Sequence, residues 1–150
     1  MQAQRQILIV EDNPGDIRLM REALRDLGPG ISIQIAMDAD QALEYLQRRG
    51  EHVNAERPSL IFLDFNLPKA GSRDLLRTIK EDEELRLIPV AVLTTSDSDR
   101  DIREAYELHA NCYLRKPVDL DSFFETIRRA ADFWLKVAYT ANGLRPYSSY

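Results

Sequence analysis

A run of apolar residues that ends on a carboxylate restricts the fold of this chain more than any other feature. Residues 60–63 are Leu, Ile, Phe and Leu, which predicts a strand buried on both faces, as in a parallel sheet. Asp64 ends the run, and Pro68 prevents the strand from continuing. A charge at the end of a buried strand is costly unless something compensates it, and ligand crevices form at such ends. For Asp64 alone, a turn or a helix cap would be the simpler interpretation, so the residues at the other strand ends decide whether it has a functional role.

Strand-like and helix-like segments alternate along the chain. Residues 31–35 alternate apolar and polar side chains, which is typical of an edge strand. Asn13 and Pro14 are suited to the N-cap and the first turn of a helix. Five repeats of strand and helix predict a doubly wound α/β domain with a parallel sheet. Strands are expected at 7–10, 31–35, 60–63, 89–93 and 111–115, a second helix at about 39–49 and the last at about 119–138.

The composition is that of an ordinary soluble domain. Of the 150 residues, 30% are charged and 44% hydrophobic, enough for a single domain with a core. A formal net charge of −5 goes against nucleic-acid binding, and no apolar run is long enough to span a membrane. The single cysteine, Cys112, cannot form an internal disulfide, so we expect a small core residue in a cytoplasmic protein. His52 and His109 lack the spacing of metal ligands.

Polar side chains close four of the five predicted strands. Glu11 and Asp12 follow the first strand, Asp64 the third, Thr94 the fourth and Lys116 the fifth. These ends lie along one edge of a parallel sheet. Converging carboxylates repel one another unless a cation is present, and Mg²⁺ is the hard cation that oxygen ligands favour. A lysine and a hydroxyl beside it suit phosphoryl oxygens. Only the joint placement of these residues predicts Mg²⁺-assisted phosphoryl chemistry with a carboxylate nucleophile.

Four short motifs at these strand ends resemble the receiver domain of bacterial two-component response regulators, the CheY-like family. They occur in the family's order, over about residues 7–127, and the combination is highly specific. The opening Glu-Asp-Asn-Pro-Gly-Asp and the later Phe-Trp-Leu at 133–135 resemble the single-domain regulators of bacterial and cyanobacterial phytochromes. The resemblance implies a flavodoxin-like sheet with strand order 2-1-3-4-5. The motifs are Val-Glu-Asp-Asn at 10–13, Leu-Asp-Phe-Asn-Leu-Pro at 63–68, Leu-Thr-Thr-Ser at 93–96 and Tyr-Leu-Arg-Lys-Pro at 113–117.

The resemblance assigns a role to each acidic residue. Asp64 would accept the phosphoryl group from a sensor histidine kinase. Asp12, Asp64 and the backbone carbonyl of Asn66 would hold Mg²⁺, and Glu11 would act mostly through water. The protein itself would not be an enzyme but a phosphoacceptor that catalyses its own phosphorylation and dephosphorylation.

The resemblance also assigns the switch residues. Lys116 would pair with the phosphoryl group, and Thr94 would hydrogen-bond to it. Tyr113 would change rotamer together with Thr94, a role that depends wholly on the resemblance. The Lys116–Pro117 peptide bond would be cis, a form that costs little only before proline. Gly71-Ser72 departs from the family's frequent Asp-Gly, which leaves the turn after the active-site loop undecided.

Three other functions fit part of this pattern. A phosphatase of the haloacid-dehalogenase type also uses an aspartyl nucleophile, but it requires a second Asp where this chain has Asn66. A receiver-like scaffold that works without phosphorylation usually lacks one of the acidic or lysine positions, and this chain keeps them all. A nucleotide-binding fold would need a glycine-rich loop after the first strand, which is missing.

The apolar pattern of the last helix predicts a contact with a second copy of the chain. An apolar face would dock on the sheet, while Phe133, Leu135 and Val137 lie off it and would form an exposed patch. With the resemblance, this predicts a two-fold homodimer through the fourth helix, the fifth strand and the last helix. The docking face comprises Leu120, Phe123, Phe124, Ile127, Ala131 and Trp134.

We expect residues 1–138 to form the receiver domain and 139–150 a partly disordered tail. Because the tail is too short for a DNA-binding or enzymatic domain, the receiver is expected to stand alone and to signal through protein contacts.

Overall fold

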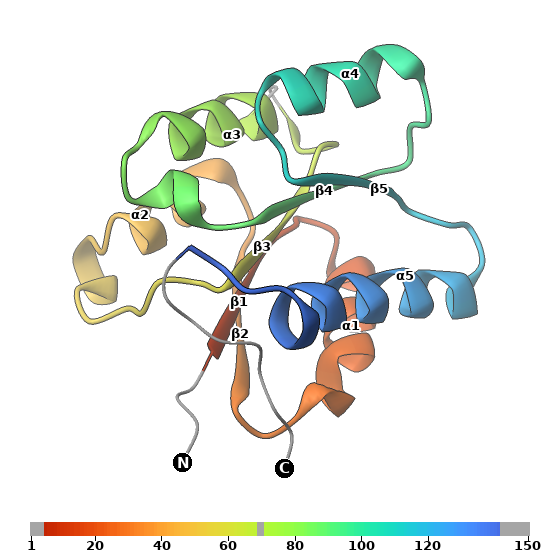
Figure 1. The fold of residues 1–150 in the computed structure, drawn as a ribbon, viewed down its shortest axis with the longest axis horizontal. Helices are drawn as coiled ribbons and strands as arrows, with labels where there is room; N and C mark the ends of the chain where they lie inside the picture. The colour runs from red at the N-terminus through yellow and green to blue at the C-terminus, as the bar shows by residue number, and fades with distance from the viewer. Residues whose placement is uncertain (1–4, 69–70, 142–150) are drawn as a thin grey trace.

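The computed structural model describes residues 5–68 and 71–141, which form a five-stranded parallel sheet between helices (Figure 1). The strand order is β2-β1-β3-β4-β5, and every adjacent pair is parallel. The doubly wound fold and its strand order, both expected from the sequence, are therefore confirmed. The strands are β1 (Arg5–Val10), β2 (Ile31–Ala36), β3 (Leu60–Asp64), β4 (Val90–Thr94) and β5 (Cys112–Arg115).

Helices cover both faces of the sheet. Helices α1 (Pro14–Leu24) and α5 (Leu120–Asp132) lie side by side on one face. Helices α2 (Ala39–Leu46), α3 (Gly71–Glu81) and α4 (Asp99–Glu107) cover the other. The core is accordingly divided into two apolar layers by the sheet. Each layer is filled by alternate residues of the same strands, because successive side chains of a strand point to opposite faces.

The burial of each strand follows its place in the sheet. Every residue of the central strand β3 is buried, as the apolar run predicted. Strand β2 pairs only with β1 and is half-buried over most of its length, as expected of an edge strand. The central position of β3 places Asp64 between the ends of β1 and β4.

The helix starts are fixed by side-chain caps directly after the strands. Asn13 accepts a hydrogen bond from the Asp16 backbone N–H at 3.0 Å, and Pro14 is the first residue of α1, as predicted. Ser98 and Asp119 cap α4 and α5 in the same way. These caps place the helix N-termini beside the strand ends that carry the polar residues.

Helix α2 is shorter than predicted. It ends at Leu46 rather than near residue 49, because Arg48 adopts a left-handed backbone conformation with a φ of 56°. A non-glycine residue in this conformation cannot continue a right-handed helix.

The end of the last helix differs from the sequence expectation. The α-helix stops at Asp132 and continues as a π-helical segment over Phe133–Val137, closed by a hydrogen bond from the Ala138 N–H to the Phe133 carbonyl. Leu135 is fully buried, so its assignment to an exposed patch was wrong. It follows Ala131 by four residues and continues the same buried row.

The rest of this region agrees in part with the expectation. Phe133 and Val137 are exposed, at 49% and 58%, as predicted. Leu120, expected to dock on the sheet, is instead 49% exposed. The predicted tail at 139–150 lies mostly outside the described residues.

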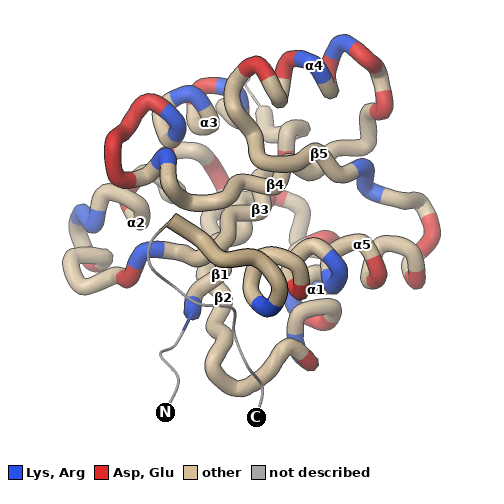
Figure 2. The backbone as a smooth tube through the Cα atoms, in the orientation of Figure 1, with Lys and Arg blue, Asp and Glu red and all other residues tan. Residues whose placement is uncertain are grey.

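Charged residues lie mainly on the helices and their connections, with both signs interspersed in the view of Figure 2. Among residues 5–68 and 71–141, no helix has the length and apolar character needed to cross a bilayer.

Candidate functional site

The parallel sheet brings the predicted polar residues to one edge. Glu11 and Asp12 directly follow β1, Asp64 is the last residue of β3 and Thr94 the last of β4. Lys116 follows β5. Strands β1, β3, β4 and β5 are consecutive in the sheet, so the carboxyl ends of all four meet. These residues, which are tens of positions apart in the sequence, therefore lie together at one edge of the sheet.

Three carboxylates form a compact acidic cluster. Glu11, Asp12 and Asp64 each offer one oxygen, and these oxygens lie within 4.8 Å of one another. Glu11 and Asp64 are 1% and 3% exposed, while Asp12 is half-buried at the mouth of the cluster. Convergent carboxylate oxygens are the ligand type that hard divalent cations bind, so the residues fit such an ion. Asp12 also faces a groove that Asp38 and Asp40 line.

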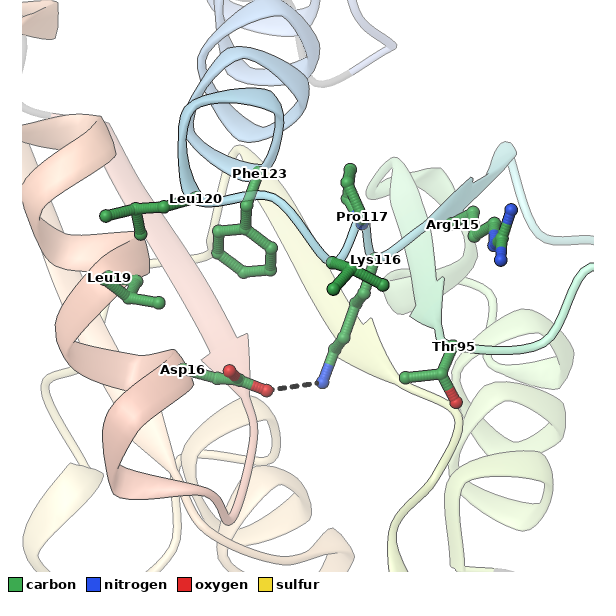
Figure 3. Close-up of a pocket in the computed structure, with 9 residues that line it drawn as sticks. Asp16, Leu19, Thr95, Arg115, Lys116, Pro117, Leu120 and Phe123 are labelled. Atoms are coloured by element: carbon green, nitrogen blue, oxygen red, sulfur yellow. Dashed lines mark hydrogen bonds and ion pairs between the residues drawn. The ribbon is translucent and has the colours of Figure 1, made fainter.

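Lys116 provides the positive charge beside this cluster. Its Nζ atom lies 2.9 Å from Glu11 Oε2 and 3.5 Å from Asp64 Oδ1. The same nitrogen lies 2.9 Å from Asp16 Oδ2, on the first turn of α1 (Figure 3). The Lys116 side chain is only 9% exposed, so these ion pairs are poorly screened by solvent.

Burial and neighbouring charges shift the pKa values of both members of this pair. Burial and, to a lesser extent, the Asp64 charge together raise the pKa of Glu11 to about 7, although Lys116 partly opposes both effects. Burial alone would lower the pKa of Lys116. Hydrogen bonding to Asp16 and the charges of Asp64 and Glu11 outweigh burial, so the Lys116 pKa is raised. The site therefore has an excess of negative charge that favours a bound cation or a proton.

The segment after β3 is fixed by its own hydrogen bonds. The Asn66 backbone N–H donates to Asp64 Oδ1 at 2.9 Å, and Asn66 Oδ1 accepts from the Thr95 N–H at 3.2 Å. The buried Ser72 hydroxyl donates to the Asp64 backbone carbonyl. Ser72, at the departure from the family's pattern, therefore supports the end of β3 from the start of α3. The proposed metal contact of the Asn66 carbonyl stays a prediction.

Thr94 and Tyr113 both contact Ser96. Thr94 is buried, and its Oγ1 accepts a hydrogen bond from the Ser96 N–H at 3.1 Å. The Tyr113 hydroxyl donates to the Ser96 carbonyl at 2.8 Å. The two residues predicted to switch together are thus joined through one residue of the loop between β4 and α4. Their role as switch residues stays a prediction.

Comparison with known proteins identifies the family. The model of the response regulator receiver domain matches residues 7–128. The chain belongs to the response regulator receiver domain family. The response regulator Rcp1 of Synechocystis sp. is 43% identical over 130 residues, which cover 87% of this chain and 88% of Rcp1.

Solved structures support the same relationship. The phosphorylated cyanobacterial phytochrome response regulator RcpA superposes with a TM-score of 0.88 at 42% identity, covering 93% of this chain and 99% of RcpA. The Mn²⁺-bound form of Rcp1 superposes with a TM-score of 0.84 at 41% identity, covering 91% of this chain and 98% of Rcp1. This receiver domain is therefore related to the regulators of phytochromes, as the sequence indicated.

One expectation carried over from the family is wrong for this receiver domain. The peptide bond between Lys116 and Pro117 is trans rather than cis. The trans form is intrinsically preferred before proline by about 0.5–1 kcal/mol. The Lys116 N–H donates to the Thr94 carbonyl at 2.7 Å, and the Lys116 amine reaches the acidic cluster with the trans bond in place.

Sequence reasoning missed two residues of the site. Asp16 contacts Lys116, and Ser72 contacts the Asp64 carbonyl. The only signal for Asp16 was its position in the first turn of α1, where an acidic residue is ordinary because it favours the helix dipole. Ser72 was visible only as a departure from the family's pattern.

Removal of Asp12 is expected to abolish most of the stabilisation by Mg²⁺. Because the ion would bind only the folded chain, a concentration of 100 times Kd should stabilise the wild type by about 2.7 kcal/mol. Asp12→Ala should lose most of this gain. Asp40→Ala, from the same acidic groove, should retain it and is a better control than Asp38, which caps α2. Thermal unfolding of each variant with and without Mg²⁺ measures the gain, and equal gains would place the ion elsewhere.

Glu11 should make the metal-free protein less stable at higher pH. Its folded pKa of about 7 exceeds the ordinary value of 4.5, so the folded state binds this proton more tightly. The resulting stabilisation is complete below about pH 4.5 and is lost as the pH rises through about 7. Between pH 5 and pH 8 in EDTA, the free energy of unfolding should therefore fall more steeply for the wild type than for Glu11→Gln. Urea unfolding curves measure both slopes, and parallel slopes would contradict this assignment.

Proposed function

We propose that this chain is a response regulator that accepts a phosphoryl group from a sensor histidine kinase on Asp64. The observation that carries the proposal is the position of Asp64. Its carboxylate is buried at the end of β3, inside the acidic cluster and 3.5 Å from the Lys116 amine. A nucleophile, a candidate cation site and a phosphate-binding cation are thus combined at one point.

The chemistry follows from these residues. An Asp64 carboxylate oxygen forms a bond to phosphorus while the phosphorus–nitrogen bond of the kinase phosphohistidine breaks, and the imidazole leaves with the electron pair. Lys116 pairs with the phosphoryl oxygens and Thr94 donates a hydrogen bond to one of them. Glu11, Asp12, Asp64 and the Asn66 carbonyl would hold Mg²⁺. When bound, Mg²⁺ would neutralise charge that develops on the phosphoryl oxygens.

Phosphorylation would be transmitted through Ser96. The Thr94 hydroxyl accepts from the Ser96 N–H, so a rotation of the Thr94 side chain that lets the hydroxyl donate to the phosphoryl group would disturb this contact. Tyr113 is bonded to the carbonyl of the same residue, so its side chain would respond to a movement of the loop. The altered surface of α4 and β5 would then be recognised by another protein.

The relatives support a phytochrome as the kinase and a divalent cation in the site. RcpA is described as a cyanobacterial phytochrome response regulator, and Rcp1 binds Mn²⁺. We place the transfer in the cytoplasm, because the single cysteine of this chain fits a reducing compartment. The alternative is a receiver-like scaffold that does not use phosphorylation. The complete set of Asp64, Lys116 and two further carboxylates goes against that alternative.

We also propose a homodimer through α4, β5 and α5. Strand β5 is an edge of the sheet, and an apolar groove runs between it and α5. Phe133 is half-exposed there and packs edge-on against Trp134, with 5.1 Å between the ring centroids. With Leu135 buried, the contact would be narrower than the sequence suggested. The groove is lined by Asn111, Cys112, Leu114, Thr126, Arg129, Ala130, Phe133 and Trp134.

Substitution of Asp64 tests the phosphoacceptor. Asp64→Asn keeps the size of the side chain but removes the nucleophilic oxygen, so phosphorylation by acetyl phosphate or a cognate kinase should be abolished while the fold is kept. Intact mass and circular dichroism measure the two outcomes. Glu107→Gln, which removes an exposed carboxylate on α4, is the matched control and should be phosphorylated normally. An Asp64→Asn protein that still gains a base-labile phosphate would assign the acceptor to another residue.

A charge in the apolar groove tests the dimer. The wild type should sediment as a dimer at micromolar concentration, and Phe133→Glu should sediment as a monomer because the new carboxylate would be buried at the contact. Val53→Glu is the control, since Val53 is 64% exposed and lies outside the groove. A monomeric wild type, or a Phe133→Glu dimer of unchanged stability, would contradict the proposed dimer.

A further inference from the structure

Lys116 is held by two carboxylates other than the proposed phosphoacceptor. Its Nζ atom lies 2.9 Å from both Glu11 Oε2 and Asp16 Oδ2, but 3.5 Å from Asp64 Oδ1. An ammonium group has three N–H donors, and two of them are hydrogen-bonded to Glu11 and Asp16. Glu11 belongs to the acidic cluster, whereas Asp16 does not. The contact with Asp16 therefore needs its own explanation.

The start of α1 builds Asp16 into this position. Its backbone N–H donates to the Asn13 cap at 3.0 Å, which fixes the backbone next to the site. Its side chain is 30% exposed, so it is more enclosed than a solvated residue of a helix start. In Figure 3, Asp16 points from α1 across a cleft to Lys116, and Leu19 and Phe123 also line this cleft. The ion pair between Asp16 and Lys116 thus joins two side chains that are largely shielded from solvent.

The Asp16 charge opposes what Lys116 must do during phosphorylation. In transfer from acetyl phosphate, an Asp64 oxygen bonds to phosphorus while the phosphorus–oxygen bond to acetate breaks, and acetate leaves with the electron pair. Lys116 must then turn toward the phosphoryl oxygens, which competes with its charge-assisted hydrogen bond to Asp16. The Asp16 carboxylate also repels the incoming dianion. Both effects slow the phosphorylation of Asp64.

We propose that Asp16 is a positioning residue that holds Lys116 on the α1 side of the site and thereby slows phosphorylation of Asp64. This inference rests on the proposed function of Asp64. Asp16 affects the rate by holding Lys116 and by the repulsion of its charge, without touching the transferred group.

The test compares three variants with acetyl phosphate and Mg²⁺ in the full chain. Asp16→Asn keeps the shape and an oxygen acceptor but removes the charge, and its initial rate should rise by roughly three- to tenfold, the effect of a half-buried ion pair. Asp16→Glu restores the charge and should return the rate to near the wild-type value. Glu22→Gln removes the same charge from the same helix, but Glu22 pairs with Arg25, so its rate should not change. Intact mass spectrometry over time gives the rates.

A second measurement detects the contact without phosphorylation. The chain has only four lysines, so lysine-labelled protein should give few NMR signals. Asp16→Asn replaces a charged hydrogen-bond acceptor of the Lys116 amine by a neutral one, so the chemical shift of the Lys116 side chain should change. Glu22→Gln should leave it unchanged.

The outcomes separate this inference from the proposed function. A wild type that takes up no phosphate, or takes it up equally after Asp64→Asn, overturns the proposed function and this inference with it. If Asp64 is phosphorylated but Asp16→Asn is no faster than the wild type, only the inference is overturned. The same holds if Glu22→Gln accelerates the reaction equally, if Asp16→Glu is as fast as Asp16→Asn, or if the chemical shift of the Lys116 side chain does not change in Asp16→Asn.

Discussion

The ion pairs of Lys116 are the interaction on which the rest of the site depends. Glu11 and Asp64 are buried at neighbouring strand ends, and burying unpaired charges costs several kcal/mol per ion. One ammonium group offsets only part of this cost, so burial and, to a lesser extent, the Asp64 charge raise the pKa of Glu11. The fold therefore maintains a site that gains free energy from a cation. This constraint links the position of Lys116 after β5 to that of Glu11 after β1, 105 residues earlier.

The sheet order explains why the constraint can be met. In the order β2-β1-β3-β4-β5, the strand that carries Asp64 lies between the strands that end at the other acidic residues and at Thr94. Strand β5 lies one place farther out, and a lysine is long enough to cross that distance and reach both Asp64 and Glu11.

Much of this arrangement could be predicted from the sequence, because it depends on where buried strands end. The apolar run before Asp64 and the alternation of strands and helices predicted the sheet, and the family motifs predicted its order. The burial of Leu135 was not predicted, because Trp134 and Leu135 follow Ala131 by three and four residues, and the sequence does not decide which of them continues the buried row. The contact of Asp16 with Lys116 could not be predicted from the sequence either. It depends on how α1 and the β5–α5 connection approach each other, which no local pattern encodes.

The contacts beyond the acidic cluster connect it to the opposite side of the domain. Phe65, next to Asp64, packs under the Arg73 guanidinium at 4.5 Å from the ring centroid, and Arg73 pairs with Asp101 and Glu104 of α4. Asp101 in turn accepts a hydrogen bond from the Ser96 hydroxyl at 2.6 Å. Ser96 therefore contacts Thr94 on one side, Tyr113 of β5 on another and α4 on a third. Because these contacts share one residue, a displacement of Thr94 must be accommodated in α4 and β5 together, the elements that carry the proposed dimer surface.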